Sequence, residues 1–329
     1  MASIGKKQQK RPSKKSSLET MEEEIHNQIE DLPAFASGLR KDHRFRHLDP
    51  SNMIFTGSGD SFASSFFAHY LSETEAFAAD PFELQIYPRV TKNKNLFITS
   101  VSGKTRANIQ LARKVKGVAK KRVAITANPN SPLAKECDDV IQLRYRSPGI
   151  LTSGTVSFSA SLLAVASLIR RLPRLDSLPT IEKRAAERAR SLRVHPGGEL
   201  LFIGSGTGYA LAMYAAFKIH EVQGLPAQYQ HTEQLGHSQL FSLQENSDNL
   251  LFLAPSSDQK TSQVFQVLLD GGFHAYLLNG AMRDPILAAL QVTFCIQHLA
   301  LNLGKKMGLK ECSFLIDRKK LALSSRLIY

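Results

Sequence analysis

The sequence predicts an α/β protein made of two doubly wound subdomains, each a parallel sheet with helices on both faces. Three observations lead to this class. Apolar, strand-like runs alternate with helical stretches, a strand that ends in a glycine-rich turn and a helix occurs twice, and a short proline-containing segment separates the two copies. Strands that alternate with helices in this way form right-handed crossovers between parallel strands. The length of 329 residues agrees, because a single core rarely grows beyond about 250 to 300 residues.

The first copy follows a leading helix, which is expected over 18–39 because its apolar residues recur at helical spacing. The first strand, 53–56, ends in the turn Gly57-Ser58-Gly59-Asp60-Ser61, and a helix follows over 62–71. The remaining elements expected in this copy are strands over 96–99, 122–127 and 139–143 and an apolar helix over 156–169.

The second copy repeats this order after a break. Two prolines within 172–179 mark the break, and a charged helical stretch follows over 180–193. A strand over 200–203 ends in the turn Gly204-Ser205-Gly206-Thr207-Gly208 and leads into a helix over 209–222. The counterparts of the later strands are expected over 250–253 and 274–278.

These boundaries define the expected domain organisation. The segments are a basic disordered tail (1–18), a leading helix and connection (19–50), a first subdomain (51–171), a linker and helix (172–193), and a second subdomain with a C-terminal tail (194–329).

Composition and charge exclude several classes of protein. With 43% hydrophobic and 22% charged residues the composition is that of a globular protein, and no apolar run of about 20 residues suggests a membrane span. The net charge of +13 is concentrated at the N-terminus, where six basic residues and no acid fall within residues 1–18. This tail is expected to be solvated, or else to contact nucleic acid, but no nucleic-acid-binding motif accompanies it. We therefore expect a cytoplasmic chain with no membrane and no nucleic-acid partner.

The cysteines and histidines do not indicate a metal site. Cys137, Cys295 and Cys312 are far apart in the sequence and form no C-x-x-C pair. His231 and His237 lie near Glu233, but at a spacing that matches no familiar metal motif. We expect chemistry that needs neither a metal nor a cofactor.

A phosphate-binding turn is expected after the strand over 96–99. Ser100, Ser102 and Thr105 surround Gly103 immediately before a helical stretch. The first N–H groups of a helix have no intrahelical partner and attract anions, and hydroxyls at this spacing add further donors. The alternative is that Ser102 only caps an ordinary helix.

A second hydroxyl cluster, Ser153 and Thr155 around Gly154, precedes the helix over 156–169. Both clusters fall in the first copy. The matching stretch of the second copy, 255–258, has no glycine and contains an acid. A bound phosphate should therefore belong to the first copy.

The second copy offers ionisable groups instead. Lys218 and Glu221 are separated by three positions, so both project from one face of the helix over 209–222, and His237 follows later in the chain. A carboxylate and a histidine can act as a general acid–base pair. The alternatives are that Lys218 and Glu221 form a surface ion pair and that His237 is an ordinary loop histidine.

The two glycine-rich turns do not indicate a dinucleotide site. Each lacks the third glycine of the G-x-G-x-x-G fingerprint, so nucleotide binding is not expected.

Taken together, these residues resemble the sugar isomerase (SIS) domain family, in its double-domain form, over about residues 20–329. The family's phosphate loop has the form Ser-x-Ser-Gly-x-Thr, which Ser100, Ser102, Gly103 and Thr105 fill, with Lys104 in place of the usual acid or amide. The resemblance implies two SIS-type, flavodoxin-like subdomains. It also implies that sugar-binding residues come from the first turn and from the second hydroxyl cluster: Ser58, Gly59, Asp60, Ser61, Ser153 and Thr155.

The resemblance further implies roles for the ionisable residues. Glu221 would move a proton between carbons 1 and 2 of an open-chain sugar phosphate, His237 would open the sugar ring, and Lys218 would stabilise developing oxyanion charge. In this family the histidine often comes from the neighbouring subunit. A homodimer with shared active sites is therefore expected.

Two positions depart from the family pattern. Gln234 replaces the usual glutamate before His237, and Leu323 falls where a lysine forms a Schiff base with a ketose. An amidotransferase domain is also not expected, because the sequence starts Met1-Ala2-Ser3. The expected function is aldose–ketose isomerisation, deamination or deglycation of a hexose or amino-hexose 6-phosphate without glutaminase activity. The alternative is a non-catalytic phosphosugar-binding protein that regulates a partner through the basic tail.

Overall fold

The computed structural model describes residues 15–45, 48–195, 197–255 and 258–329. Most of the expected basic tail lies outside these residues, so its conformation remains an expectation. The helices and strands that organise the site are α1 (Ser17–Lys41), β1 (Met53–Gly57), α2 (Asp60–Leu71), β3 (Asn95–Thr99), α4 (Arg106–Lys114), α6 (Val156–Ile169), α7 (Leu178–Ser191), β6 (Leu200–Gly204), α8 (Thr207–Val222) and α11 (Pro285–Lys306).

The first half contains a five-stranded parallel sheet in the order β2-β1-β3-β4-β5. Its strands are β1 and β3 with β2 (Phe77–Ala78), β4 (Lys121–Thr126) and β5 (Asp139–Gln142). The side chains of β1 and β3 are buried along their whole length, as expected for strands covered on both faces. This strand order is that of the flavodoxin-like doubly wound fold.

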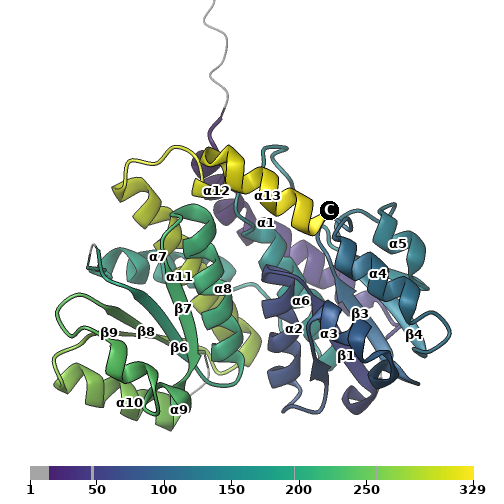
Figure 1. Ribbon diagram of the computed structural model, residues 1–329, viewed down its shortest axis with the longest axis horizontal. Coiled ribbons are helices and arrows are strands. Elements are labelled where there is room, and N and C mark those ends of the chain that lie inside the picture. Colours follow the sequence, from purple (N-terminus) through teal and green to yellow (C-terminus); the bar gives the residue numbers. More distant parts are fainter. Residues whose placement is uncertain (1–14, 46–47, 196, 256–257) are drawn as a thin grey trace, which may run out of the picture.

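The second half contains a four-stranded parallel sheet in the order β7-β6-β8-β9. Its strands are β6 with β7 (Ala227–His231), β8 (Asn249–Ala254) and β9 (His274–Asn279). Figure 1 shows the two sheets side by side, with α2, α6 and α8 between them. The predicted fold class, two doubly wound parallel sheets with helices on both faces, is confirmed.

The repeat extends to backbone conformation. Gly59 before α2 has φ +60° and Gly206 before α8 has φ +54°, values that L side chains rarely adopt. Both helices therefore begin after the same kind of glycine turn.

Alternate residues of each strand face different helices. In the first sheet Ile54 and Ile98 pack against the outer helices α3 (Pro81–Ile86), α4 and α5 (Pro132–Glu136), whereas Phe55 and Phe97 face inward. In the second sheet Leu201 and Leu250 likewise face an outer cluster that includes α10 (Gln259–Asp270). The inward faces of both sheets share one core with α1, α2, α6, α7, α8 and α11. The two halves are thus joined by a common hydrophobic core.

Several elements were not identified from the sequence. The strands β2 and β7 are short or partly polar, and α9 (Thr232–Leu235), α10, α12 (Ser313–Ile316) and α13 (Arg318–Ile328) carry no long apolar pattern. The largest omission is α11, a 22-residue helix that contains an 18-residue window with a mean hydropathy of 1.6, long and apolar enough to cross a membrane. The expectation that no apolar run approaches this length was wrong. In the fold most of this helix is buried against α7, α8 and α1.

The leading helix also begins earlier than expected. Ser16 caps α1 in a capping box with Glu19, so the helix includes residues assigned to the tail. At the other end of the chain, α13 lies across the top of the molecule in Figure 1 and ends near α4. There the Arg106 side chain donates a hydrogen bond to the carbonyl of Tyr329 (2.9 Å).

Candidate functional site

Two turns of the first half lie at the same edge of the sheet. β1 and β3 are neighbouring parallel strands, with Gly57 in register with Thr99. The chain leaves β1 through Ser58 and Gly59 and leaves β3 through Ser100. Because neighbouring strands are about 4.8 Å apart, the predicted sugar-binding turn and the predicted phosphate loop start side by side.

The predicted phosphate loop, residues 100–105, is a compact turn in front of α4. Ser100 Oγ lies 3.3 Å from Thr105 Oγ1, and the Gly103 N–H donates to the Ser100 carbonyl (3.0 Å). The Ser102 hydroxyl is exposed and accepts a hydrogen bond from the Lys104 N–H (3.2 Å). The helix cap is Thr105, whose side chain makes no capping bond. The alternative that Ser102 caps this helix is therefore wrong, and no side chain in the described part of the chain accepts a hydrogen bond from the first N–H groups of α4.

Gly103 is required by the shape of this loop. Its φ is +64°, and a Cβ at this position would lie 2.1 Å from the Ser131 hydroxyl oxygen. Ser131 itself caps α5 by accepting from the Ala134 N–H (3.2 Å). The loop is thus held against a neighbouring turn that leaves no room for a side chain.

The second half contributes a buried lysine to this region. Lys218 of α8 has no exposed side-chain surface, and its Nζ donates to Asp60 Oδ2 (2.7 Å), to Ser153 Oγ (2.8 Å) and to Glu221 Oε2. Ser153 in turn donates to Glu221 Oε2 (2.6 Å). The alternative of a surface ion pair between Lys218 and Glu221 is therefore wrong. Residues of both halves meet in one charged cluster, which we define as Asp60, Ser153, Lys218 and Glu221.

Aromatic packing holds this cluster in place. Tyr214, one turn before Lys218 on α8, stacks on Phe158 of α6 with ring centroids 3.6 Å apart. Its hydroxyl donates to the Gly154 carbonyl (3.1 Å), in the segment that carries Ser153. The Lys218 Nζ lies 5.3 Å from the centre of the Tyr214 ring, within reach of a cation–π interaction.

The electrostatics of the cluster are dominated by burial and by two carboxylates around one ammonium. Burial raises the pKa of Asp60 to about 7, Lys218 opposes that rise, and Glu221 adds to it. Burial by itself lowers the pKa of Lys218, but Asp60 and Glu221 outweigh it and the pKa is raised. The lysine is therefore charged at neutral pH, whereas Asp60 is close to its titration range.

Sequence reasoning missed a polar layer beneath the cluster. Thr155 Oγ1 donates to the buried carboxylate of Glu24 on α1 (2.7 Å), and burial raises the pKa of Glu24. Thr155 is therefore turned toward α1, and the structure gives no support to its expected contact with a sugar. The signal that could have found Glu24 is its place on the apolar face of α1, beside Met21 and Ile25.

A buried glutamine joins this layer to the rest of the core. Gln297 of α11 donates to the Thr155 carbonyl (3.2 Å) and to the Tyr214 hydroxyl (3.2 Å), and accepts from Gln28 of α1 (2.8 Å). Four helices, α1, α6, α8 and α11, therefore meet at the base of the charged cluster.

Other predicted residues lie apart from this cluster within the single chain. His237 is 68% exposed, and its Nε2 lies 3.4 Å from Glu233 Oε1. Within one chain this matches the alternative of a loop histidine. Leu323, at the family's lysine position, is exposed on α13. Ser58 is exposed in the first turn, and Ser61 is buried as the second residue of α2.

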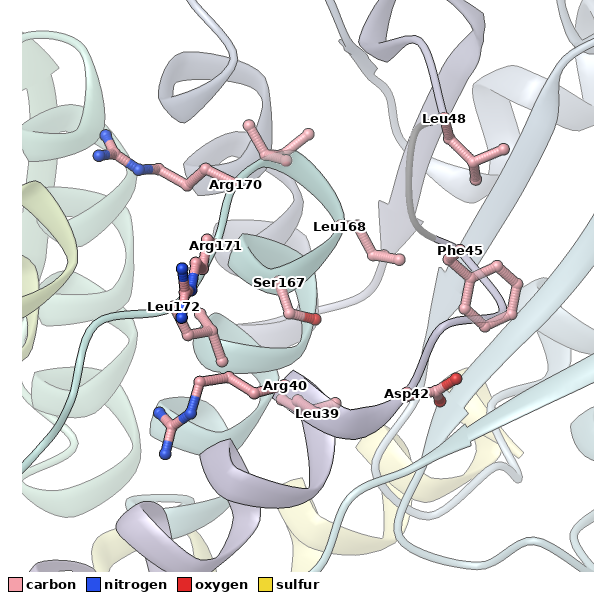
Figure 2. Close-up of a pocket in the computed structure, with 11 residues that line it drawn as sticks. Leu39, Arg40, Asp42, Phe45, Leu48, Ser167, Leu168, Arg170, Arg171 and Leu172 are labelled. Carbon is pink, nitrogen blue, oxygen red and sulfur yellow. The ribbon is translucent and has the colours of Figure 1, made fainter.

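A separate hollow of about 620 Å³ lies near the C-terminal ends of α1 and α6 (Figure 2). Phe45, Leu48 and Leu168 line one side, while the guanidinium groups of Arg170 and Arg171 point away from that side. Its lining includes none of the predicted site residues. We therefore assign the candidate site to the charged cluster and the phosphate loop.

Comparison with known proteins agrees with the resemblance seen in the sequence. Residues 48–171 match the SIS domain family. A glutamine–fructose-6-phosphate aminotransferase (isomerizing) from Clostridium acetobutylicum is 21% identical over 53% of this chain and 33% of its own length. The chain thus spans about a third of the length of this relative.

Solved structures share the fold across both halves. The C-terminal domain of glucosamine-fructose-6-phosphate aminotransferase from Francisella tularensis superposes with a TM-score of 0.70 at 17% identity, covering 89% of this chain and 97% of that one. A glucosamine-6-phosphate deaminase from Thermotoga maritima superposes with a TM-score of 0.70 at 18% identity, covering 88% and 96%. At such identities the likeness is one of fold alone.

Proposed function

We propose that the protein is a phosphosugar isomerase-type enzyme, because residues 48–171 match the SIS domain family. It would act on a hexose or amino-hexose 6-phosphate, moving a proton between carbons 1 and 2 of the open-chain sugar. The observation that carries the proposal is the contact between halves: Lys218, which also contacts Glu221, pairs with Asp60, the first residue of α2 after the turn beside the proposed phosphate loop.

The phosphate would bind at the start of α4. Ser100, Ser102 and Thr105 offer hydroxyls, and the first N–H groups of the helix face an anion without competition from a capping side chain. Charge-assisted hydrogen bonds contribute roughly 1.5 to 3 kcal/mol each, so a few of them suffice for binding at micromolar to millimolar concentration.

Glu221 is the proposed base. The Glu221 side chain is 39% exposed, so a substrate can reach it, while Ser153 and Lys218 both donate hydrogen bonds to Oε2. The Lys218 ammonium is fixed beside it and would stabilise the oxyanion that develops as the enediol or enolamine forms. Such preorganised charge is effective because the surroundings are buried and cannot reorganise.

Two further features belong to the proposal. A homodimer would allow the exposed His237 to act as the ring-opening residue in the neighbouring subunit's site, and the protein would work in the cytosol. Because Leu323 cannot form an imine, the reaction would proceed by direct proton transfer on the open-chain sugar phosphate without a Schiff base.

A regulatory, non-catalytic phosphosugar-binding protein is the second candidate, and the replacement of the family's lysine by Leu323 favours it. Against it stands the charged cluster, since a sensor needs the phosphate loop but no base held by a lysine and a serine.

The test is proton exchange in heavy water followed by NMR, with fructose, glucose, mannose and glucosamine 6-phosphate as substrates. We expect deuterium at carbon 1 or 2 of at least one sugar. Glu221→Gln should abolish exchange and leave binding nearly unchanged, because the amide keeps the shape but cannot take a proton. Glu245→Gln, at an exposed position away from the cluster, is the matched control.

Two results would count against the enzyme. If one sugar binds but none exchanges, the regulatory candidate is favoured. If Glu221→Gln exchanges at the wild-type rate, Glu221 is not the base.

A further inference from the structure

The charged cluster contains more acid than base. Lys218 is its one cation, and two carboxylates, Asp60 and Glu221, contact its Nζ directly. Glu24 lies close enough beneath the cluster to interact with the Lys218 charge. Among the described residues, no cation other than Lys218 contacts Asp60 or Glu221.

The acids also form the open side of the cluster. The side chain of Glu221 is 39% exposed and that of Asp60 is 18% exposed, whereas Lys218 is fully enclosed. A ligand that enters from solvent therefore meets carboxylates first and reaches the ammonium only behind them.

Asp60 is incompletely paired. Its Oδ2 accepts from Lys218, but its Oδ1 is buried and has no hydrogen-bond partner among the described residues. A buried acceptor without a donor is costly, so a donor supplied by a bound group would stabilise the Asp60 carboxylate. Because Oδ1 is enclosed, a ligand would reach it after the carboxylate turns about its Cβ–Cγ bond, a torsion with broad preferences.

We infer that Asp60 selects a sugar phosphate that carries a protonated amine at its reacting end over the same sugar with a hydroxyl. The ammonium would donate to the Asp60 carboxylate and supply the second positive charge that the cluster lacks. The inference rests on the proposed function, since the phosphate loop must hold the other end of the same sugar.

The raised pKa of Asp60 agrees with this role. Its ionised form is disfavoured by burial and by Glu221, and Lys218 alone does not fully compensate both carboxylates. A cationic ligand would add to this compensation. A competing explanation is that Asp60 serves only as an acid at the N-terminus of α2 and as the counter-ion of Lys218, which would leave sugar selectivity unaffected.

The experiment compares the dissociation constants of glucosamine 6-phosphate and glucose 6-phosphate by calorimetry, with inorganic phosphate as the probe of the loop alone. Wild type should bind the amino sugar at least about tenfold more tightly than the hydroxy sugar, which corresponds to about 1.4 kcal/mol. Asp60→Asn should bring this ratio close to one, because it keeps the side-chain shape and removes the charge. Asp60→Glu, which keeps the charge, should retain part of the preference.

Two control variants separate charge recognition from phosphate binding. Ser102→Ala should weaken both sugars and phosphate by a similar factor and leave the ratio intact. Asp49→Asn, in an exposed capping position outside the site, should change nothing. If Asp60→Asn does not fold, Asp60→Ser provides the uncharged comparison.

A ratio near one in wild type, or an unchanged ratio in the uncharged variants, would overturn the inference. Its failure is distinguishable from failure of the proposed function. Tighter binding of the amino sugar without any proton exchange would support this inference and contradict the proposed enzymatic activity. Absence of binding by both sugars and by phosphate would remove the phosphate loop, and with it both proposals.

Discussion

Asp60 differs from most of the aspartates whose pKa the structure perturbs. Hydrogen bonds and nearby cations lower the pKa of Asp42, Asp49 and Asp138. Burial instead raises the pKa of Asp60, even though Lys218 lies 2.7 Å away. One ammonium shared between two carboxylates cannot fully compensate both, so part of the cost of burying Asp60 remains.

This cost should appear in the pH dependence of stability. The pKa of Asp60 is about 7 in the folded protein against 3.8 for an ordinary aspartate. The contribution of Asp60 to the free energy of unfolding is therefore fully present below about pH 4 and is lost as the pH rises through about 7. A shift of about three units corresponds to at most about 4 kcal/mol. Asp60→Asn should therefore gain stability relative to wild type between pH 5 and pH 8, measured by urea unfolding.

Asp138→Asn provides the comparison. A hydrogen bond from Arg122 lowers the pKa of Asp138, so its contribution is lost only as the pH falls below about 4. Between pH 5 and pH 8 the stability difference between this variant and wild type should stay constant. A constant difference for Asp60→Asn as well would show that Asp60 is already ionised throughout this range.

At the scale of elements, the site depends on the turns that connect strands to the following helices. The turn before α2 and the loop before α4 leave neighbouring strands at one edge of the sheet. Each of these two connections contains a glycine with positive φ, Gly59 in the first and Gly103 in the second. Loop shape, more than side-chain chemistry, therefore decides where the serine hydroxyls lie.

Gly103→Ala tests this dependence. The new Cβ would collide with Ser131, which caps α5, and the backbone would be strained as well. Gly117→Ala is the matched control, since Gly117 has φ +77° but open space around it. The control should lose about 1 to 2 kcal/mol of unfolding free energy from backbone strain. Gly103→Ala should lose more and should bind phosphate more weakly, as shown by denaturant titration and calorimetry. Equal losses in the two variants would mean that the loop tolerates the side chain.

At the scale of the whole molecule, the two halves are not independent. The inward faces of both sheets, with Phe97 in the first and Phe202 in the second, belong to one core. Gln297 adds hydrogen bonds that link α11 to α1, α6 and α8. The charged cluster sits at this junction, so its geometry depends on both sheets.

We therefore expect a single unfolding transition. Phe97→Ala and Phe202→Ala should each destabilise by about 3 to 5 kcal/mol and should lower the protection of both β3 and β8 in hydrogen-exchange mass spectrometry. Protection lost only in the half that carries the substitution would show that the halves unfold separately.

Much of the fold could be read from local pattern. The strands β1, β3, β6 and β8 are short apolar runs, and the glycine-rich turns after β1 and β6 repeat each other, which indicated two parallel sheets. α11 was not identified from the sequence because it is buried on several sides. Its apolar residues therefore show little helical periodicity. β7 was missed because only its first residue is buried.

The sequence by itself determined the fold class, the position of the serine-rich loop before α4 and the placing of Lys218 and Glu221 on one helix face, because each rests on residues close together in the chain. Only the tertiary structure decided that Asp60 is the second counter-ion of Lys218, that Ser153 holds Glu221 and that Thr155 faces Glu24. Those contacts join segments far apart in sequence, and their strength depends on burial. Burial is a property of the packed core that no local pattern records.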